Sequence, residues 1–354
     1  MGGTRRRGAL LGLGNVAVHG HLPGWRTRSD CEIVAATDAS PARRAVCREV
    51  LPAARWYDSV ESLLAHEALD FVDICTPPSS HALLIEAALS RRLHVLCEKP
   101  LVGAPEALAR LVTRARGVRR VLHTVHNWHH APLVRATDAV IRSGRIGAVQ
   151  EVRWHTLRTQ PAAAAAGDAW RVDPGIAGGG VLTDHGWHVS YVIPRWVGEA
   201  PVAVSARLET RRHHRFAVED TATLHLHFPS AEAEIVLTWA ADRRENHAAV
   251  VGSAGRITIE DDTLVVTTRE GEERRACPPS LATGSQHPDW FGAVAQEFLG
   301  RIDAGGDPAA SGNLDEAAMC LAIEGGARES SRRGGARLPL AGATRDAARA
   351  EAAG

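Results

Sequence analysis

Lysine is almost absent from this chain of 354 residues. Lys99 is the single lysine among 41 basic residues, and the other 40 are arginine. Arginine stays protonated at any workable pH, whereas burial can tune a lysine to give or take a proton. Lys99 follows the apolar, strand-like run 93–97. We therefore expect a tuned ammonium group at a functional site, with an ordinary surface lysine as the alternative.

Net charge and long apolar runs are also missing. The formal charge is zero, which removes the electrostatic case for binding nucleic acid or an anionic membrane surface. No apolar run approaches the length of a membrane span. The basic start, residues 1–7, precedes an apolar stretch that glycines interrupt, so it does not read as a signal peptide.

The six cysteines show no CxxC spacing, and several lie in apolar runs. We interpret them as reduced, buried thiols of a cytoplasmic protein. The length predicts two domains, and the 45% apolar and 23% charged content is typical of a soluble globular protein. The tail 341–354, rich in alanine, arginine and glycine, is expected to be flexible.

The stretch from Gly8 to Ala17 reads as a buried strand, a glycine turn and a helix, and it fits G-x-G-x-x-G/A. Gly12 would allow the tight turn, Gly14 the close approach of a pyrophosphate, and Ala17 the packing of helix on strand. A glycine turn alone is weak evidence. A second strand, 32–38, ends in Asp38, 24 residues past Gly14, where an acid could bind the ribose hydroxyls; a helix N-cap is the alternative.

Further strands are predicted at 70–75, 93–97 and 121–125, with helices between them. This alternation predicts a doubly wound parallel sheet, in which ligands bind beyond the carboxyl ends of the strands. The motifs at those ends are Thr76-Pro77-Pro78 with His81, and Glu98-Lys99-Pro100. After the fifth strand come His126, His129 and His130. No carboxylate or cysteine stands beside these histidines in sequence, so we predict no metal there and expect them to line a cleft.

From residue 149 the pattern changes to consecutive strands of alternating polarity, which predicts a mostly antiparallel open sheet. These strands are 149–157, 202–208, 221–228, 232–239, 248–251, 256–260 and 264–268. An insert between the first two holds Trp170-Arg171, then Gly178-Gly179-Gly180, then Asp184 and His188. At helical spacing i and i+4 the carboxylate could orient the imidazole for proton transfer; a surface ion pair is the alternative.

With these motifs in this order, from Ala9 to about Leu340, the sequence resembles the glucose–fructose oxidoreductase, inositol dehydrogenase and rhizopine-catabolism family (Gfo/Idh/MocA). The resemblance implies an N-terminal Rossmann domain (1–125) that binds NAD, with NADP not excluded. It implies an α/β second domain (126–340) whose open sheet commonly joins subunits into a homodimer or homotetramer. The expected cofactor contacts are Gly12, Gly14, Asn15, Val16, Asp38, Thr76, Pro77, His81, Glu98 and Lys99.

The resemblance also implies that Lys99, Asp184 and His188 surround the reacting carbon, with His188 as proton acceptor. Two departures concern the substrate: Tyr191 replaces an aspartate common in polyol dehydrogenases, and an arginine common after the fifth strand is absent from 128–130. Aromatic and neutral polar groups suit a sugar or cyclitol ring. The expected substrate contacts are Lys99, Asn127, His129, Trp170, Arg171, His188 and Tyr191.

The predicted function is hydride transfer between nicotinamide and a secondary alcohol or ketone carbon of a cyclic polyol or sugar derivative. Two alternatives remain open. One is an NAD-dependent glycosidase that uses transient oxidation, as some relatives do. The other is a non-catalytic sensor of nucleotides or sugars on the same fold, which would have no need of a proton-transfer set.

Overall fold

The computed structural model describes residues 5–162, 169–284, 286–305 and 312–340. The tail 341–354, expected to be flexible, lies outside the described residues. The chain forms two compact units: Met1–His130 with Gly284–Ala318, and Ala131–Thr283 with Met319–Gly354. The predicted division at residues 125 and 126 stays a prediction, and it differs from this grouping mainly in one segment, 284–318. Among the helices that the structure describes, none is both long and apolar enough to span a bilayer.

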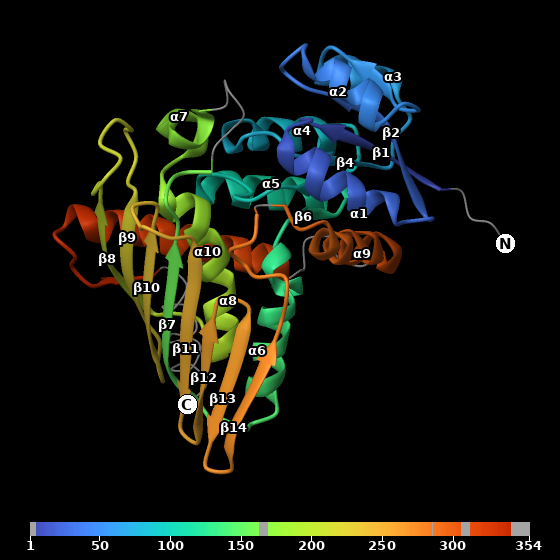
Figure 1. Ribbon diagram of the computed structural model, residues 1–354. Coiled ribbons are helices and arrows are strands. Elements are labelled where there is room, and N and C mark those ends of the chain that lie inside the picture. The colour runs from blue at the N-terminus through green and yellow to red at the C-terminus, as the bar shows by residue number, and fades with distance from the viewer. Residues whose placement is uncertain (1–4, 163–168, 285, 306–311, 341–354) are drawn as a thin grey trace, which may run out of the picture. The chain divides into compact units, whose positions relative to one another are not determined.

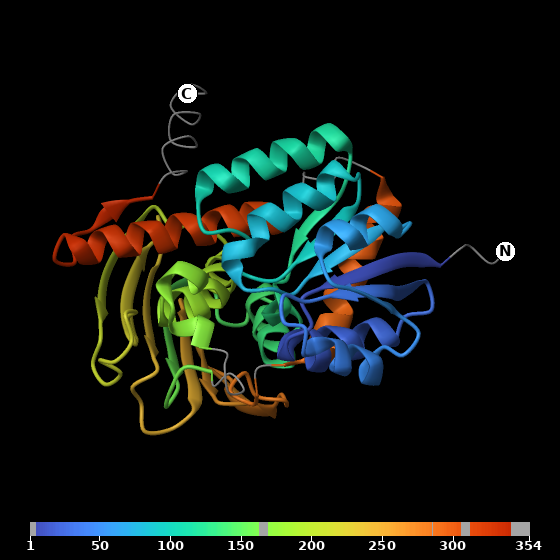
Figure 2. The same ribbon diagram turned by 90° about the horizontal axis from the view of Figure 1, so that it is seen from above.

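The first unit is built on a parallel sheet of six strands in the order β3-β2-β1-β4-β5-β6. Both faces are covered by helices, and the buried residues of β1, β4 and β5 are mostly apolar, with Asp73 as the charged exception. In Figure 2, α4 and α5 lie on one side of this sheet and α1 and α9 on the other. The strands are β1 Arg6–Leu11, β2 Cys31–Thr37, β3 Arg55–Tyr57, β4 Phe71–Ile74, β5 His94–Cys97 and β6 Leu122–Thr124.

The predicted parallel, doubly wound sheet is confirmed, with one strand added. Sequence analysis missed β3, an edge strand of three residues that is too short to show a periodic pattern. The helices and turns of this unit are η1 Ala17–His21, α1 Leu22–Arg26, α2 Arg43–Val50, α3 Val60–His66, η2 Pro78–Ser80, α4 His81–Ser90, α5 Pro105–Val118, η3 Asn127–His130 and α9 Pro288–Ala304.

Helix α9 belongs to the first unit although it lies far along the chain. Its residues Phe291, Val294 and Phe298 recur at helical spacing and are buried in the same core as Trp25 and Phe71. Burying three large side chains is worth on the order of several kcal/mol, which explains why this helix returns to the N-terminal sheet. Sequence analysis had assigned it to the second domain because it follows that domain's strands.

The second unit holds a sheet of nine strands in the order β14-β13-β12-β11-β7-β10-β9-β8-β15. Every neighbouring pair is antiparallel except β7 with β10, so the predicted mostly antiparallel sheet is confirmed. Figure 1 shows it as one twisted sheet. The strands are β7 Val149–Leu157, β8 Ala203–Glu209, β9 Thr221–His227, β10 Glu232–Thr238, β11 Glu245–Gly252, β12 Gly255–Glu260, β13 Thr263–Thr268, β14 Gly271–Ala276 and β15 Leu338–Pro339.

Burial alternates along these strands, as a half-buried sheet requires. In β7 the side chains of Val152, Trp154 and Thr156 are buried, and the residues between them are partly or fully exposed. The helices and turns of this unit are α6 Pro132–Arg142, η4 Ala169–Val172, α7 Pro174–Ala177, η5 Leu182–Gly186 and α8 Trp187–Val197. The long helix α10, Gly312–Arg332, begins in the first unit and continues into the second.

Candidate active site

The glycine turn after β1 needs glycine for two different reasons. Gly12 has a φ of +93°, and a Cβ there would lie 2.9 Å from the backbone of Cys75 and Thr76. A Cβ on Gly14 would meet nothing within 4 Å. The space in front of Gly14 can therefore admit a pyrophosphate against the backbone, while Ala17 is fully buried against the core.

Asp38 closes this turn from the end of β2. The backbone N–H of Leu13 donates to its Oδ2 at 2.7 Å, and that of Ser40 donates to its Oδ1 at 2.8 Å. The N-cap of α2 is Ala42, so the capping role considered for Asp38 is wrong. The carboxylate is half-buried beside the glycine turn. Asp38 thus lies beside the glycine turn, and its contact with the ribose stays a prediction.

His81 joins the loops that follow β4 and β5. The ring is fully buried, with Nδ1 2.8 Å from the carbonyl oxygen of Pro100 and Nε2 2.8 Å from that of Thr76. Ser80 Oγ also donates to Thr76 Oγ1 at 2.7 Å. The structure therefore shows His81 tying together the two loops that carry Thr76-Pro77 and Lys99. The predicted contact of His81 with the cofactor stays a prediction.

A buried chain of polar groups holds Glu98 next to Lys99. His21 lies between two carboxylates, with Nδ1 2.9 Å from Asp73 Oδ2 and Nε2 2.9 Å from Glu98 Oε1. Trp25 donates to Asp73 at 2.7 Å, and Glu98 Oε2 accepts from the backbone N–H of Lys99 at 2.9 Å. Burial alone would lower the pKa of His21, but the charge of Asp73 and the neighbouring thiol outweigh it and raise that pKa well above its ordinary value.

The network of His21, Asp73 and Glu98 holds the backbone of Lys99 in place. Burial would raise the pKa of Glu98, but hydrogen bonding and charge from His21 outweigh burial and lower it, so Glu98 is ionised. An imidazolium between two carboxylates fixes the Glu98 side chain and, through it, the backbone of Lys99 at the carboxyl end of β5. Lys99 itself is half-buried. Sequence analysis found Lys99 and Glu98 but missed His21 and Asp73, because their partnership spans 52 residues.

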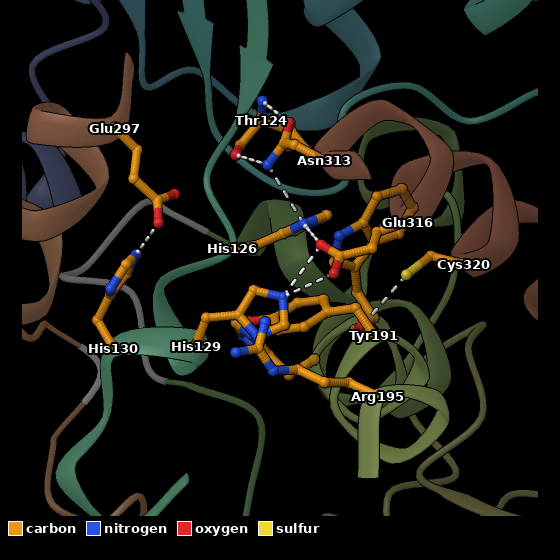
Figure 3. Close-up of polar contacts among 12 residues, drawn as sticks. Thr124, His126, His129, His130, Tyr191, Arg195, Glu297, Asn313, Glu316 and Cys320 are labelled. Atoms are coloured by element: carbon orange, nitrogen blue, oxygen red, sulfur yellow. Dashed lines mark hydrogen bonds and ion pairs between the residues drawn. The ribbon is translucent and has the colours of Figure 1, made fainter. Parts of the chain in front are cut away.

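The histidines after β6 meet a carboxylate from a distant helix (Figure 3). Glu316 of α10 lies 2.9 Å from His126 Nδ1 and 3.0 Å from His129 Nε2. Burial would raise the pKa of Glu316, but hydrogen bonds from the two imidazoles hold it at about 2. His130 forms a separate pair with Glu297 of α9, at 3.6 Å. Sequence analysis missed both carboxylates, which stand at least 167 residues from their partners.

Asn127 offers an open acceptor in this region. Its Oδ1 is buried and has no hydrogen-bond partner within the described part of the chain. Leaving a buried carbonyl oxygen unpaired costs about 1–3 kcal/mol. The predicted substrate role of Asn127 is consistent with this orphaned atom.

In the second unit, the glycines before η5 leave room for the Arg328 side chain and for the backbone of Glu219. A Cβ on Gly179 would lie 1.8 Å from the guanidinium of Arg328, and one on Gly180 would lie 1.9 Å from the carbonyl oxygen of Glu219. Glu219 Oε1 accepts from the backbone N–H groups of Gly180 and Leu182, at 3.0 and 3.3 Å. The glycine run therefore lets Glu219 cap the first turn that carries Asp184.

His188 lies in α8 and contacts a residue that sequence analysis assigned to the substrate. Its Nδ1 is 2.9 Å from the hydroxyl of Tyr191, which is fully buried. Asp184 lies in η5, whose π-helical winding differs from the α-helical spacing assumed in the sequence, and its carboxylate is 3.6 Å from His185 Nε2. The Tyr191 hydroxyl therefore contacts the Nδ1 side of the His188 ring.

Two residues predicted to contact the substrate, Trp170 and Arg171, lie at the η4–α7 turn. The guanidinium of Arg171 stacks 4.3 Å from the centre of the Trp170 ring. Asp173, two residues further on, caps α7 by accepting from the backbone N–H of Gly175 at 2.8 Å. Asp173 thus has a structural role, whereas Trp170 and Arg171 form a stacked aromatic–cation pair.

His123 predicts acid sensitivity. Its ring is buried in β6, its Nδ1 has no partner within the described residues, and burial lowers its pKa to about 3. In the unfolded chain the imidazole of His123 is protonated below about pH 6.5, whereas in the folded chain it stays neutral down to about pH 3. The free energy of unfolding should therefore fall as the pH drops from 6.5 toward 3. His123→Leu should flatten the fall in the free energy of unfolding between pH 6.5 and 4.5 by roughly 1 kcal/mol per pH unit, measured by denaturant unfolding at each pH. The same change at the exposed His214 should leave that slope unaltered; an unaltered slope in His123→Leu would contradict the prediction.

Two family models match most of the chain. Residues 6–126 match the model described as oxidoreductase family, NAD-binding Rossmann fold, and residues 134–258 match the GFO/IDH/MocA C-terminal domain. Among curated relatives, a D-apiose dehydrogenase of Paraburkholderia graminis is 28% identical over 92% of this chain and 88% of its own length. An inositol 2-dehydrogenase of Rhizobium meliloti is 26% identical over 89% of this chain and 94% of its own.

Solved structures share the fold. An oxidoreductase from Agrobacterium radiobacter, in complex with NAD+, L-tartaric acid and magnesium, has a TM-score of 0.84 at 23% identity and covers 95% of this chain and 98% of its own. A levoglucosan dehydrogenase, in complex with NADH and levoglucosan, has a TM-score of 0.82 at 21% identity and covers 96% of this chain and 100% of its own. At these identities the likeness shows the fold alone.

Proposed function

We propose a specific reaction for this chain, which belongs to the Gfo/Idh/MocA family of oxidoreductases with an NAD-binding Rossmann domain: it moves a hydride between nicotinamide and a secondary alcohol or ketone carbon of a cyclic polyol or sugar derivative. The observation that carries the proposal is the network that fixes Lys99. The Asp73–His21–Glu98 chain holds this single lysine at the carboxyl edge of the sheet whose first strand ends in the glycine turn.

The cofactor would lie along that edge. Gly12, Gly14, Asn15 and Val16 would face its pyrophosphate and Asp38 its ribose, while the loops carrying Thr76-Pro77 and Glu98-Lys99 would line the nicotinamide end. The open space before Gly14 is the feature that fits this group. When bound, the nicotinamide supplies the hydride chemistry. The protein supplies orientation and proton transfer.

Proton transfer is assigned to Lys99 and His188. Lys99 would donate to the substrate oxygen and stabilise its developing charge, and His188 would exchange the proton of the reacting hydroxyl. Asp184 would support His188 from the preceding turn. The Tyr191 hydroxyl, in contact with His188 Nδ1, would keep Nε2 as the nitrogen that exchanges the proton.

The substrate class rests on neutral and aromatic groups. Asn127 offers an unsatisfied acceptor, His129 an imidazole, and Trp170 with Arg171 a stacked pair. Such groups suit a ring whose C–H face stacks and whose hydroxyls need partners. The named relatives act, by their names, on a branched sugar and on inositol. Because Tyr191 replaces a carboxylate and its hydroxyl contacts His188, we expect poor activity on unmodified inositol.

We also propose that the chain forms a homodimer or homotetramer joined through the open sheet.

The test is a substrate panel of cyclitols, hexoses, pentoses, amino-sugars, sugar nucleotides and linear 2-hydroxy acids, followed at the NADH absorbance. A cyclic sugar derivative should show the highest kcat/KM. Highest turnover of unmodified myo-inositol or of a linear 2-hydroxy acid would contradict the substrate class. Glycoside cleavage without net NADH would favour transient oxidation, and ligand binding without any turnover would favour a sensor.

We predict a preference for NAD(H) over NADP(H). Asp38 would accept from both ribose hydroxyls, and its charge would repel a 2′-phosphate. Arg43 and Arg44 begin α2 nearby in sequence and could oppose this effect. The measurement is the ratio of kcat/KM for the two cofactors, with Asp38→Asn expected to reduce the ratio at least about tenfold. A preference of the wild-type enzyme for NADP would show that Arg43 and Arg44 bind the 2′-phosphate and outweigh the repulsion by Asp38.

A further inference from the structure

We propose that His126, His129 and Glu316 form a binding site for a first-row divalent transition-metal ion such as Zn²⁺. Their donor atoms, two imidazole nitrogens and a carboxylate oxygen, all lie within 4.8 Å of one another. Sequence analysis set metal aside because no carboxylate stood beside the histidines. The tertiary structure supplies it from α10, about 190 residues further along the chain.

The donor set and its spacing fit such an ion. Glu316 lies 2.9 Å from His126 Nδ1 and 3.0 Å from His129 Nε2. Ligands that bind zinc at about 2.0–2.2 Å in tetrahedral geometry lie roughly 3.3 Å apart. The two carboxylate–imidazole distances would therefore need to lengthen by only a few tenths of an ångström, and the two imidazole nitrogens lie within 4.8 Å of each other. Two imidazoles with one carboxylate are a donor set typical of zinc and its first-row neighbours, with the remaining positions taken by water or substrate.

The scaffold behind these groups is already fixed. The side chain of Asn313 pairs with the backbone of Thr124, accepting from its N–H and donating to its carbonyl oxygen, both at 2.9 Å. This pair locks the start of α10 to the end of β6. Glu316 follows Asn313 by one helical turn, and His126 follows Thr124 by two residues, so both ligands are positioned by the same clamp. Figure 3 shows these side chains converging.

The neighbouring pair, His130 with Glu297, gives a matched control. His130 lies in η3, as His129 does, whereas its partner Glu297 lies in α9 and not in α10. Neither residue belongs to the three-residue site. The same contacts satisfy His126, His129 and Glu316 as hydrogen bonds, so a purely hydrogen-bonded trio is the competing description. A second donor cluster in the first unit, His21 with Asp73 and Cys75, would bind independently of Glu316.

The experiment is a Zn²⁺ and Co²⁺ titration of tag-free, chelator-treated full-length protein. Calorimetry gives the affinity, elemental analysis after dialysis the stoichiometry, and visible absorbance the cobalt geometry. We expect one ion per chain, at least about tenfold weaker binding in Glu316→Gln and His129→Gln, and wild-type binding in His130→Gln. Melting curves will show that each variant folds, and Zn²⁺ should raise the melting temperature of wild type but not of Glu316→Gln.

Three results would overturn the proposal. Wild type that binds no stoichiometric ion would establish the hydrogen-bonded trio. Binding that survives Glu316→Gln would place the ion elsewhere, for instance at His21. Equal loss in His130→Gln and His129→Gln would show non-specific binding by histidines. Because every readout is ion binding rather than turnover, the outcome does not depend on the reaction proposed above.

Discussion

Replacing Lys99 with arginine is expected to lower turnover by about 10²-fold or more while the protein still folds and binds NADH. A general acid–base group contributes roughly 10²–10⁴ in rate. Arginine keeps the positive charge, but it does not release its proton at neutral pH, and its planar head group is wider. The Glu98 contact to the Lys99 backbone does not involve the side chain, so the loop should keep its place.

Two comparisons make this test decisive. Lys99→Met removes the charge as well as the proton. If the site needs only the charge, turnover should be kept in Lys99→Arg and lost in Lys99→Met. If the site needs the proton, turnover should be lost in both variants. NADH binding, measured by fluorescence, and melting temperature report whether each variant is intact. Wild-type turnover in Lys99→Arg would refute the assignment of Lys99 as proton donor.

Replacing His188 should have the second-largest effect. We expect His188→Gln to lower turnover by about 10²-fold or more, and Asp184→Asn to lower it less. In the oxidative direction, wild-type turnover should rise with pH as His188 becomes able to accept a proton. His188→Gln should lose that rise. If the Asp184–His188 pair were only structural, stability would drop by a few tenths of a kcal/mol and turnover would remain.

Tyr191→Phe separates orientation from packing at this site. It keeps the buried ring but removes the hydroxyl that contacts His188 Nδ1, so we expect an intermediate loss in kcat and a displaced pH profile with little change in KM. His225→Gln, the same substitution as in His188→Gln at an exposed position of β9, should change neither. A Tyr191→Phe enzyme with an unaltered pH profile would show that Tyr191 does not orient His188.

Local patterns in the sequence were sufficient for the elements and for the motifs at strand ends. β7 runs from Val149 to Leu157 as predicted, because the polarity from Val152 to His155 alternates with period two. The glycine turn, Asp38 and Lys99 could be placed because each immediately follows an apolar run. Position after a strand is a local property, and in a parallel sheet it determines at which edge a side chain lies.

The tertiary structure decided which side chains meet. Glu316 reaches His126, His21 bridges Asp73 and Glu98, and α9 returns to the first sheet, although nothing in the local pattern links these segments. Asp184 lies in the π-helical η5, whereas His188 and Tyr191 both lie in α8, so the regular spacing assumed between Asp184 and His188 does not hold. Periodicity records which face of an element is buried. Side-chain partners depend on how distant elements pack and on local helix winding, and that information exists only in the folded chain.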